Sequence, residues 1–181
     1  LHRMSTWDTT YEFAAYFEAQ QVFVRNLASR QKRELTIRLH PGWRDMKWCE
    51  EARWQSTDTS VEIDLGMTGI RDLIRHSRLV VHSYDSTGLL ETLSQNIPTL
   101  AFWQNGFDHL RESAKPYYKL LVDVGIVHLT SESVAGKVNE VWDDIDGWWE
   151  QRELQEARKQ FCERYARLEH QPVSKLLTIL A

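Results

Sequence analysis

The sequence is short of cysteine, of long apolar runs and of net charge. Its two cysteines, Cys49 and Cys162, lie far apart and in no CxxC or Cys/His cluster, which favours reduced thiols in a cytoplasmic protein. No apolar stretch approaches the roughly 18 residues that span a membrane, and no signal peptide is visible. The formal charge is −4 with both signs well mixed, so we expect no nucleic-acid partner. Peripheral association with the inner membrane through acceptor lipids stays open as an alternative location.

Motifs for metal binding and for several common enzyme classes are also missing. No set of His, Cys, Asp and Glu has metal-ligand spacing, and there is no GxSxG nucleophile turn and no P-loop. Asp144-Ile145-Asp146 has the spacing of a metal-binding DxD, but it lies between two expected helices beside Gly147, where loop and cap chemistry explains it better. We therefore expect neither a metal nor a bound cofactor.

Short apolar strands alternate with helices along the chain. The expected strands are residues 34–39, 61–64, 79–82, 99–103 and 126–129. The expected helices are residues 8–29, 45–54, 70–76, 86–95, 115–124, 133–142 and 148–168, with a final short helix that includes Leu176, Leu177 and Leu180. This order predicts one α/β domain over residues 1–181, with a Rossmann-like parallel sheet, helices on both faces and a long C-terminal helix.

The most informative stretch joins an apolar strand to a helix through a polar turn. Ser83, Asp85, Ser86 and Thr87 supply hydroxyls and a carboxylate where the helix begins, and Gly88 lies in its first turn. A helix N-terminus offers unpaired N–H groups and the positive end of the helix dipole, so it attracts phosphate. A glycine there lets a diphosphate approach the amides. The same residue types are preferred as N-caps, and capping is compatible with phosphate binding.

Three further side chains are candidates near this turn. Glu91 shares a helix face with Gly88 and could reach a sugar hydroxyl, although a solvated helix residue is the simpler alternative. His40 precedes a proline at the carboxyl end of the expected strand 34–39, where ligands of parallel sheets bind. It could equally end the strand and bond to a neighbouring loop. His82, at the end of an apolar strand, is better explained as a structural histidine than as an acid or base.

Two motifs carry a resemblance to known families. Residues 79–100 resemble the donor-binding half of GT-B glycosyltransferases, with a hydroxyl- and glycine-rich turn, a glutamate in the next helix and a step into the following strand where Asn96 replaces the usual glycine. His40-Pro41 is similar to the His-Pro motif of bacterial sialyltransferases, Kdo transferases and CDP-glycerol glycerophosphotransferases. From about residue 33 to 167 the chain most resembles the LIC12162-like family of bacterial surface-carbohydrate transferases.

The resemblance implies that His40 and the turn at residues 86–88 hold donor phosphate, that Glu91 binds ribose and that residues 61–66 border the base. The implied function is the donor-nucleotide-binding half of a metal-independent glycosyltransferase of bacterial surface polysaccharide or lipopolysaccharide synthesis. Its donor would be a CMP- or CDP-linked sugar and its acceptor a glycan or a lipid-linked glycan. Alternatives are a nucleotide-sugar epimerase, a CDP-glycerol-type glycerophosphotransferase and a non-catalytic Rossmann-like interaction domain.

The resemblance also implies that something is missing. GT-B C-terminal domains begin with a central strand before their first helix, whereas this chain begins at or just after that strand. We therefore expect either no central strand or an unusual one at residues 1–4. We also expect an N-terminal acceptor domain outside this sequence, which would supply the catalytic base and leave the chain alone incomplete as a catalyst.

Overall fold

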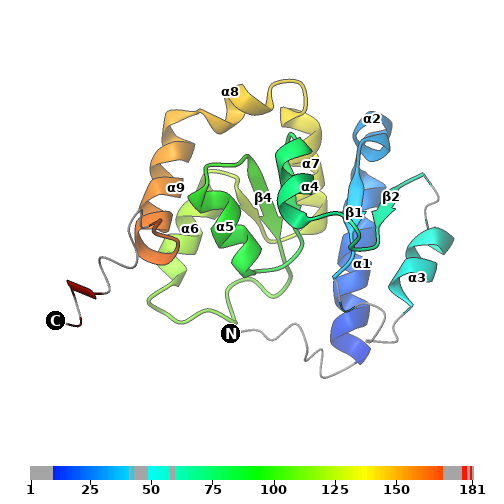
Figure 1. Ribbon diagram of the computed structural model, residues 1–181, viewed down its shortest axis with the longest axis horizontal. Helices are drawn as coiled ribbons and strands as arrows, with labels where there is room; N and C mark the ends of the chain where they lie inside the picture. Colours follow the sequence, from blue (N-terminus) through cyan, green and yellow to red (C-terminus); the bar gives the residue numbers. More distant parts are fainter. Residues whose placement is uncertain are drawn as a thin grey trace.

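The computed structural model describes residues 10–40, 42, 49–57, 60–168, 177, 178 and 180. Its helices are α1 (Thr10–Asn26), α2 (Ser29–Arg33), α3 (Glu50–Thr57), α4 (Ile70–His76), α5 (Thr87–Ser94), α6 (Lys115–Asp123), α7 (Ser131–Val141), α8 (Ile145–Trp149) and α9 (Arg152–Tyr165). Its strands are β1 (Thr36–Arg38), β2 (Glu62–Asp64), β3 (Val80–His82), β4 (Thr99–Phe102) and β5 (Val127–His128) (Figure 1). The alternation of short strands and helices confirms the expected α/β class.

The strands form two small sheets in which every pair is parallel. β1 pairs with β2, with Ile37 opposite Ile63. In the second sheet β4 lies between β3 and β5, and Val81 is opposite Leu100. Parallel neighbours need a crossover connection, which α5 supplies between β3 and β4 and α6 supplies between β4 and β5. Parallel strands flanked by helices are compatible with a Rossmann-like fold.

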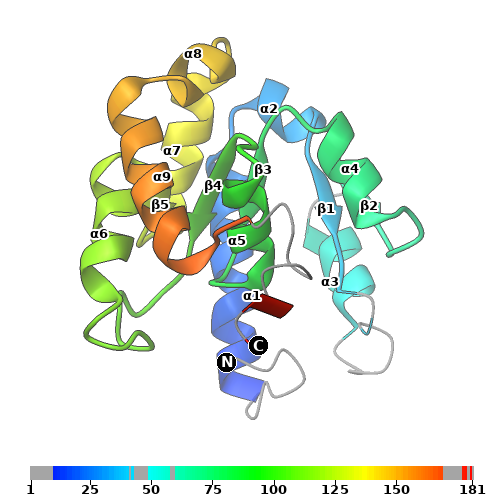
Figure 2. The same cartoon turned by 60° about the vertical axis from the view of Figure 1, so that its left-hand side comes forward.

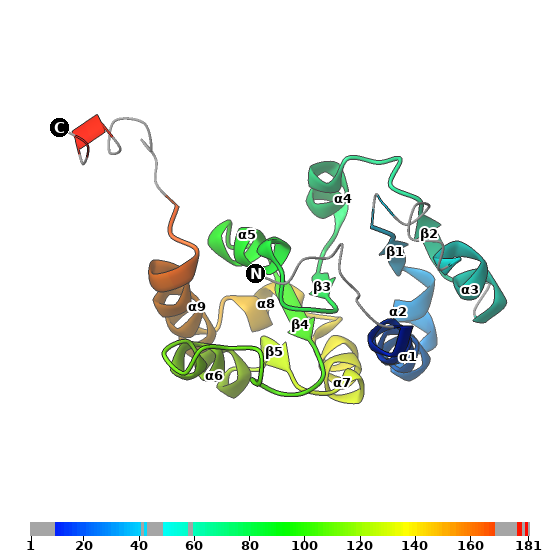
Figure 3. The same ribbon diagram turned by 90° about the horizontal axis from the view of Figure 1, so that it is seen from below.

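The best-buried strand is β4, because helices cover both of its faces. α5 lies on one side of it and α7 on the other (Figure 3). Leu100 and Ala101 are fully buried and Phe102 is 2% exposed, as expected for a strand with no solvent face. This layered arrangement confirms the prediction of helices on both faces of a parallel sheet.

Helix α1 ties the two sheets together. Phe23 of α1 stacks on Phe102 of β4 with ring centroids 5.4 Å apart. Nearer the start of α1, the ring of Phe17 meets the buried Trp54 of α3 edge-on, with ring centroids 5.0 Å apart. α1 also packs along α7, where the Asn139 side chain donates to the carbonyl oxygen of Asn26, the last residue of α1, and accepts from the backbone N–H of Ala28. The aromatic side chains of α1 therefore join both halves into one apolar core.

β1 and β3 are the edge strands on either side of the boundary between the two sheets, and they do not pair with each other (Figure 2). The order β2-β1 followed by β3-β4-β5 corresponds to the usual doubly wound order 3-2-1-4-5-6 with place 1 unfilled among the described residues. β1 and β3 are only partly buried, whereas β4 is buried throughout. Residues 1–4, where an unusual strand was expected, lie outside the described residues.

One expected element is wrong. The helix expected over residues 148–168 is two helices, α8 and α9, separated at Glu150 and Gln151. The first of them is nucleated by Asp144, whose Oδ1 accepts a hydrogen bond from the backbone N–H of Gly147 at 3.0 Å. This contact confirms the interpretation of the Asp144-Ile145-Asp146 sequence as cap chemistry. α9 remains a long C-terminal helix, with Leu154 and Phe161 buried.

Two expected helices lie partly outside the described residues. The helix expected over residues 45–54 begins at Glu50 in the described part, and residues 45–48 are not described. Of the final short helix, Leu177 and Leu180 have helical backbone, whereas Leu176 is not described.

Asn96 lies in the connection between α5 and β4, at the position where the related families usually have a glycine. Its backbone has φ = 58°, in the left-handed region that glycine reaches easily and asparagine tolerates better than most residues. Both its carbonyl oxygen and its Oδ1 accept hydrogen bonds from Trp149 Nε1, at 3.2 and 3.0 Å. The asparagine therefore keeps the conformation that a glycine would adopt and also fastens α8 to the sheet.

Candidate binding site at the carboxyl end of the second sheet

The polar turn lies where ligands of parallel sheets usually bind. Residues 83–86 follow β3 at its carboxyl end and lead directly into α5. The segment from Trp103 to Ala114 leaves the neighbouring strand β4 at the same edge. The structure therefore gathers the side chains of these two connections over one end of the sheet. Most residues of the turn are half-buried, and Thr87 is exposed.

Ser83 is engaged by helix α1. Its hydroxyl accepts a hydrogen bond from Gln20 Nε2 at 2.9 Å and lies 2.9 Å from the Tyr16 hydroxyl. Burial raises the pKa of Tyr16, so the phenol keeps its proton. These contacts join α1 to the end of β3 and give Ser83 a structural role. Its part in donor binding stays a prediction.

The first turn of α5 carries no side-chain cap. Ser86 is the N-cap residue with extended backbone, but its side chain makes no capping hydrogen bond. Thr87 and Gly88 follow as the first helical residues. The first N–H groups of a helix have no partner within the helix, so this turn offers donors to a ligand. Whether donor phosphate uses them stays a prediction.

The structure gives Gly88 a second reason to be glycine. A Cβ at this position would lie 3.0 Å from Cε1 of His82 and 3.4 Å from Oγ of Ser86. The imidazole of His82 thus packs directly against the start of α5. Any larger residue at Gly88 would require this ring to shift.

His82 is a structural histidine, as expected. The Thr92 hydroxyl donates to backbone carbonyl oxygens within α5, so it accepts from His82 Nε2–H at 3.1 Å. Burial lowers the pKa of His82 to about 4. The ring is therefore neutral at physiological pH and links β3 to α5.

Asp85 is the most highly connected residue of the turn. Tyr118 of α6 donates its hydroxyl to the carboxylate, at 3.0 Å from each oxygen. His109, in the connection after β4, places Nε2 3.2 Å from Oδ2. Burial, together with the Asp85 carboxylate, raises the pKa of Tyr118, so the phenol stays a donor. Asp85 therefore joins the turn after β3 to two parts of the chain that follow β4, the loop that carries His109 and helix α6.

His109 and Tyr118 were not among the residues singled out from the sequence. Both lie in the segment after β4, which enters the same sheet edge, and that position is the one sequence signal that could have marked them. His109 is 24 residues and Tyr118 33 residues from Asp85 in the sequence, so no short motif links them to it.

His40 and Glu91 are placed apart from this cluster. His40 follows β1 in the other sheet, is exposed, and accepts a hydrogen bond at Nδ1 from the backbone N–H of Gly42 at 3.0 Å. Glu91 is exposed on α5 one turn after Gly88. The structure thus places His40 and the turn at the carboxyl ends of two different sheets, and their roles toward a donor stay predictions.

A partly buried ion pair, close to His40 in the sequence, joins the two strands of the first sheet. Arg38 of β1 pairs with Asp64 of β2 and also donates to the carbonyl oxygen of Thr68, at 2.6 Å. The other oxygen of Asp64 accepts from the backbone N–H groups of Met67 and Thr68. This network fixes the loop after β2, which includes part of the segment expected to border the base.

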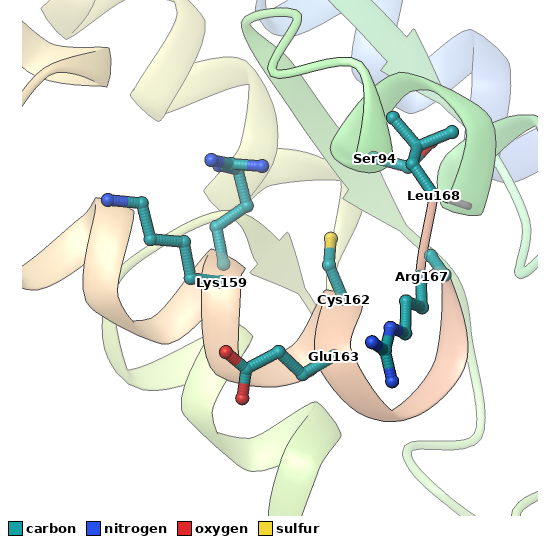
Figure 4. Close-up of a pocket in the computed structure, with 8 residues that line it drawn as sticks. Ser94, Lys159, Cys162, Glu163, Arg167 and Leu168 are labelled. Carbon is teal, nitrogen blue, oxygen red and sulfur yellow. The ribbon is translucent and has the colours of Figure 1, made fainter. Parts of the chain in front are cut away.

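An open pocket of about 180 Å³ lies at the opposite end of α5 (Figure 4). It is lined by Ser94 near the C-terminus of α5 and by side chains of α9 and the residues after it, among them Lys159, Cys162, Glu163 and Arg167. Arg158 is buried there and donates to the Leu93 carbonyl oxygen at 2.7 Å. This arginine closes the C-terminal end of α5, so the pocket is a packing feature away from the polar turn.

The described residues hold no group of three or more His, Cys, Asp or Glu that could bind a metal ion. Within the same part of the chain, no helix is both long enough and apolar enough to cross a membrane.

Parallel strands with helices on both faces define an α/β protein compatible with a Rossmann-like fold, and its polar strand-to-helix turn lies at the carboxyl ends of the strands. The chain belongs to the LIC12162 family: the model of the LIC12162 family transferases matches residues 1–180. This membership confirms the resemblance to that family and makes the protein a transferase. No curated protein and no solved structure matches the chain.

Proposed function

We propose that this chain is the donor-nucleotide-binding half of a metal-independent glycosyltransferase in bacterial surface polysaccharide or lipopolysaccharide synthesis. The single observation that carries the proposal is the uncapped first turn of α5 at the carboxyl end of β3, in a chain whose family is a transferase family. The N–H groups in the first turn of α5 and the dipole of this helix favour the binding of an anion such as a diphosphate. A site of this kind stabilises a departing nucleotide phosphate with fixed dipoles in place of a metal ion.

The residues proposed to hold the donor come from both sheets. Ser86, Thr87 and Gly88 would contact phosphate from the start of α5, and Glu91 would reach the ribose from the next turn. His40 would approach from the carboxyl end of β1, where its exposed ring is accessible to a ligand. The likeness of His40-Pro41 to the His-Pro motif favours a CMP- or CDP-linked sugar.

We further propose that the chain needs a partner domain for turnover. This proposal rests on the resemblance to GT-B C-terminal domains, whose catalytic base usually lies in an N-terminal domain. The acceptor site and the catalytic base would then belong to an N-terminal domain.

Calorimetric titration of the chain with CMP, CDP, UDP and GDP tests the proposal. We expect selective binding of a cytidine nucleotide, weakened by about threefold to tenfold in Ser86→Ala and in His40→Ala through the loss of one hydrogen bond each. Ser94→Ala, at the other end of α5, and His76→Ala, on exposed α4, are matched controls that should bind like the parent.

The outcomes separate the alternatives. Tight binding of UDP or GDP would keep a donor site but contradict the cytidine preference. Binding of none of the four nucleotides would contradict the proposal for this chain and favour a non-catalytic interaction domain. Product analysis of an active preparation distinguishes an epimerase, which changes the sugar without an acceptor, from a transferase.

A further inference from the structure

His109 and Asp85 form a histidine–carboxylate pair at the edge of the proposed donor site. Asp85 immediately precedes the N-cap residue of α5, and His109 comes from the connection after β4. Nε2 of the imidazole lies 3.2 Å from Oδ2 of the carboxylate. The His109 side chain is 36% exposed and the Asp85 side chain 21%, so the pair is accessible to a ligand.

The surroundings hold this imidazole in one orientation. The indole of Trp103 meets the His109 ring edge-on, with centroids 5.7 Å apart and planes at 89°. The indole itself is anchored by a hydrogen bond from Nε1 to the carbonyl oxygen of Gly106 at 2.8 Å. Tyr118 donates its hydroxyl to the Asp85 carboxylate, at 3.0 Å from each oxygen, and fixes the carboxylate that His109 faces. A side chain fixed in this way pays little conformational entropy when it binds a ligand.

The chemistry of the pair follows from this orientation. A charged imidazolium has two N–H groups, and both of them are donors. Nε2–H is directed to Asp85, so Nδ1–H is the donor left for a ligand. Other titratable and charged groups lie near the pair. Tyr118 also contacts the carboxylate. The connection that carries His109 also contains Asp108, Arg111 and Glu112, and Glu112 pairs with Lys115.

We propose that His109, as an imidazolium oriented by Asp85, binds the phosphate groups of the donor beside the first turn of α5. The inference rests on the proposed function and adds to it a cationic phosphate ligand. Within this site His109 is the binding group and Asp85 the positioning residue. Because the positive charge depends on a proton, the affinity for phosphate depends on pH through His109.

The test is calorimetric titration with CDP and with inorganic pyrophosphate at pH 6 and pH 8, on the parent chain and on His109→Gln, Asp85→Asn and the control His76→Gln. At pH 6 we expect His109→Gln to weaken both ligands by about tenfold, the effect of one charge-assisted hydrogen bond. At pH 8 the difference in affinity between His109→Gln and the parent should be smaller. Since the ligands titrate in the same range, the measured quantity is the difference between parent and variant at each pH.

A second readout separates binding from a merely structural effect. Titrations in buffers of different ionisation enthalpy count the protons taken up on binding. Between pH 6 and 8 the parent and His76→Gln should take up a fraction of a proton more than His109→Gln does. In Asp85→Asn the imidazole loses the carboxylate that orients it, so the affinity for both ligands should fall below that of the parent. Thermal melting shows whether each variant is folded. If Asp85→Asn is not folded, the comparison of His109→Gln with the parent tests the proposal without it.

Each outcome decides between the two proposals. Binding of CDP and pyrophosphate that is unchanged in His109→Gln, with the same proton uptake, would overturn the role of His109 and leave the donor site standing. Binding of pyrophosphate that depends on His109, with no binding of any nucleotide, would support the phosphate site and refute the nucleotide donor. Absence of binding by either ligand to the parent would refute both.

Discussion

The largely desolvated imidazole of the half-buried His82 makes the free energy of unfolding depend on pH in a way that can be calculated. Burial lowers the pKa of His82 to about 4, whereas in the unfolded chain it is near the ordinary value of 6.5. Between these two values the unfolded chain binds a proton that the native state does not. The free energy of unfolding therefore falls as the pH falls through this window, and the contribution is fully present above pH 6.5.

The size of the effect follows from the two pKa values. Between pH 7 and pH 5 the linkage relation gives a loss of about 2 kcal/mol of stability from this one group. Burial also lowers the pKa of His128, so that histidine changes stability in the same direction. The absolute pH dependence is therefore a sum, and only a comparison isolates His82.

Urea denaturation of the parent chain and of His82→Gln at pH 7 and pH 5 makes that comparison. The variant is expected to be less stable at pH 7, because the hydrogen bond to Thr92 and the packing against Gly88 are perturbed. Between pH 7 and pH 5, however, it should lose about 2 kcal/mol less than the parent does. His76→Gln, at an exposed position on α4, should lose as much as the parent. Equal losses in the parent and in His82→Gln would refute the reasoning.

Two other substitutions test contacts that organise α5 and its surroundings. Asn96→Ala should lower the free energy of unfolding by about 2 kcal/mol, from a left-handed backbone and a lost bond to Trp149, whereas Asn96→Gly should lose less because its backbone is unstrained. Equal urea midpoints for these two variants would contradict this. Arg158→Met should lose about 2 kcal/mol by removing the charge-assisted hydrogen bond from the buried guanidinium to the Leu93 carbonyl oxygen, which keeps its bond from the Asn96 N–H. Lys159→Met, its exposed neighbour, should change the urea midpoint little, and an equal loss there would exclude the specific bond as the cause.

Most of the element pattern was predictable because its signals are local. Apolar runs of four to six residues between helical stretches predicted every strand to within a residue or two. The helix break at Glu150 and Gln151 was missed, because tryptophans before it and Leu154 after it continue one apolar pattern across the break. The cap by Asp144 that starts α8 could be interpreted locally, since the capping side chain and the bonded N–H group are three residues apart.

By itself, the sequence determined the α/β class and the position of a polar turn at a strand-to-helix junction, because both depend on residues that are neighbours in the chain. The tertiary structure decided what each residue of that turn touches. Ser83 meets α1, Gly88 meets His82, and Asp85 meets His109 and Tyr118. The physical reason is that the contacts with α1, His109 and Tyr118 join segments tens of residues apart, which come together only when parallel strands bring their carboxyl ends to one edge of a sheet.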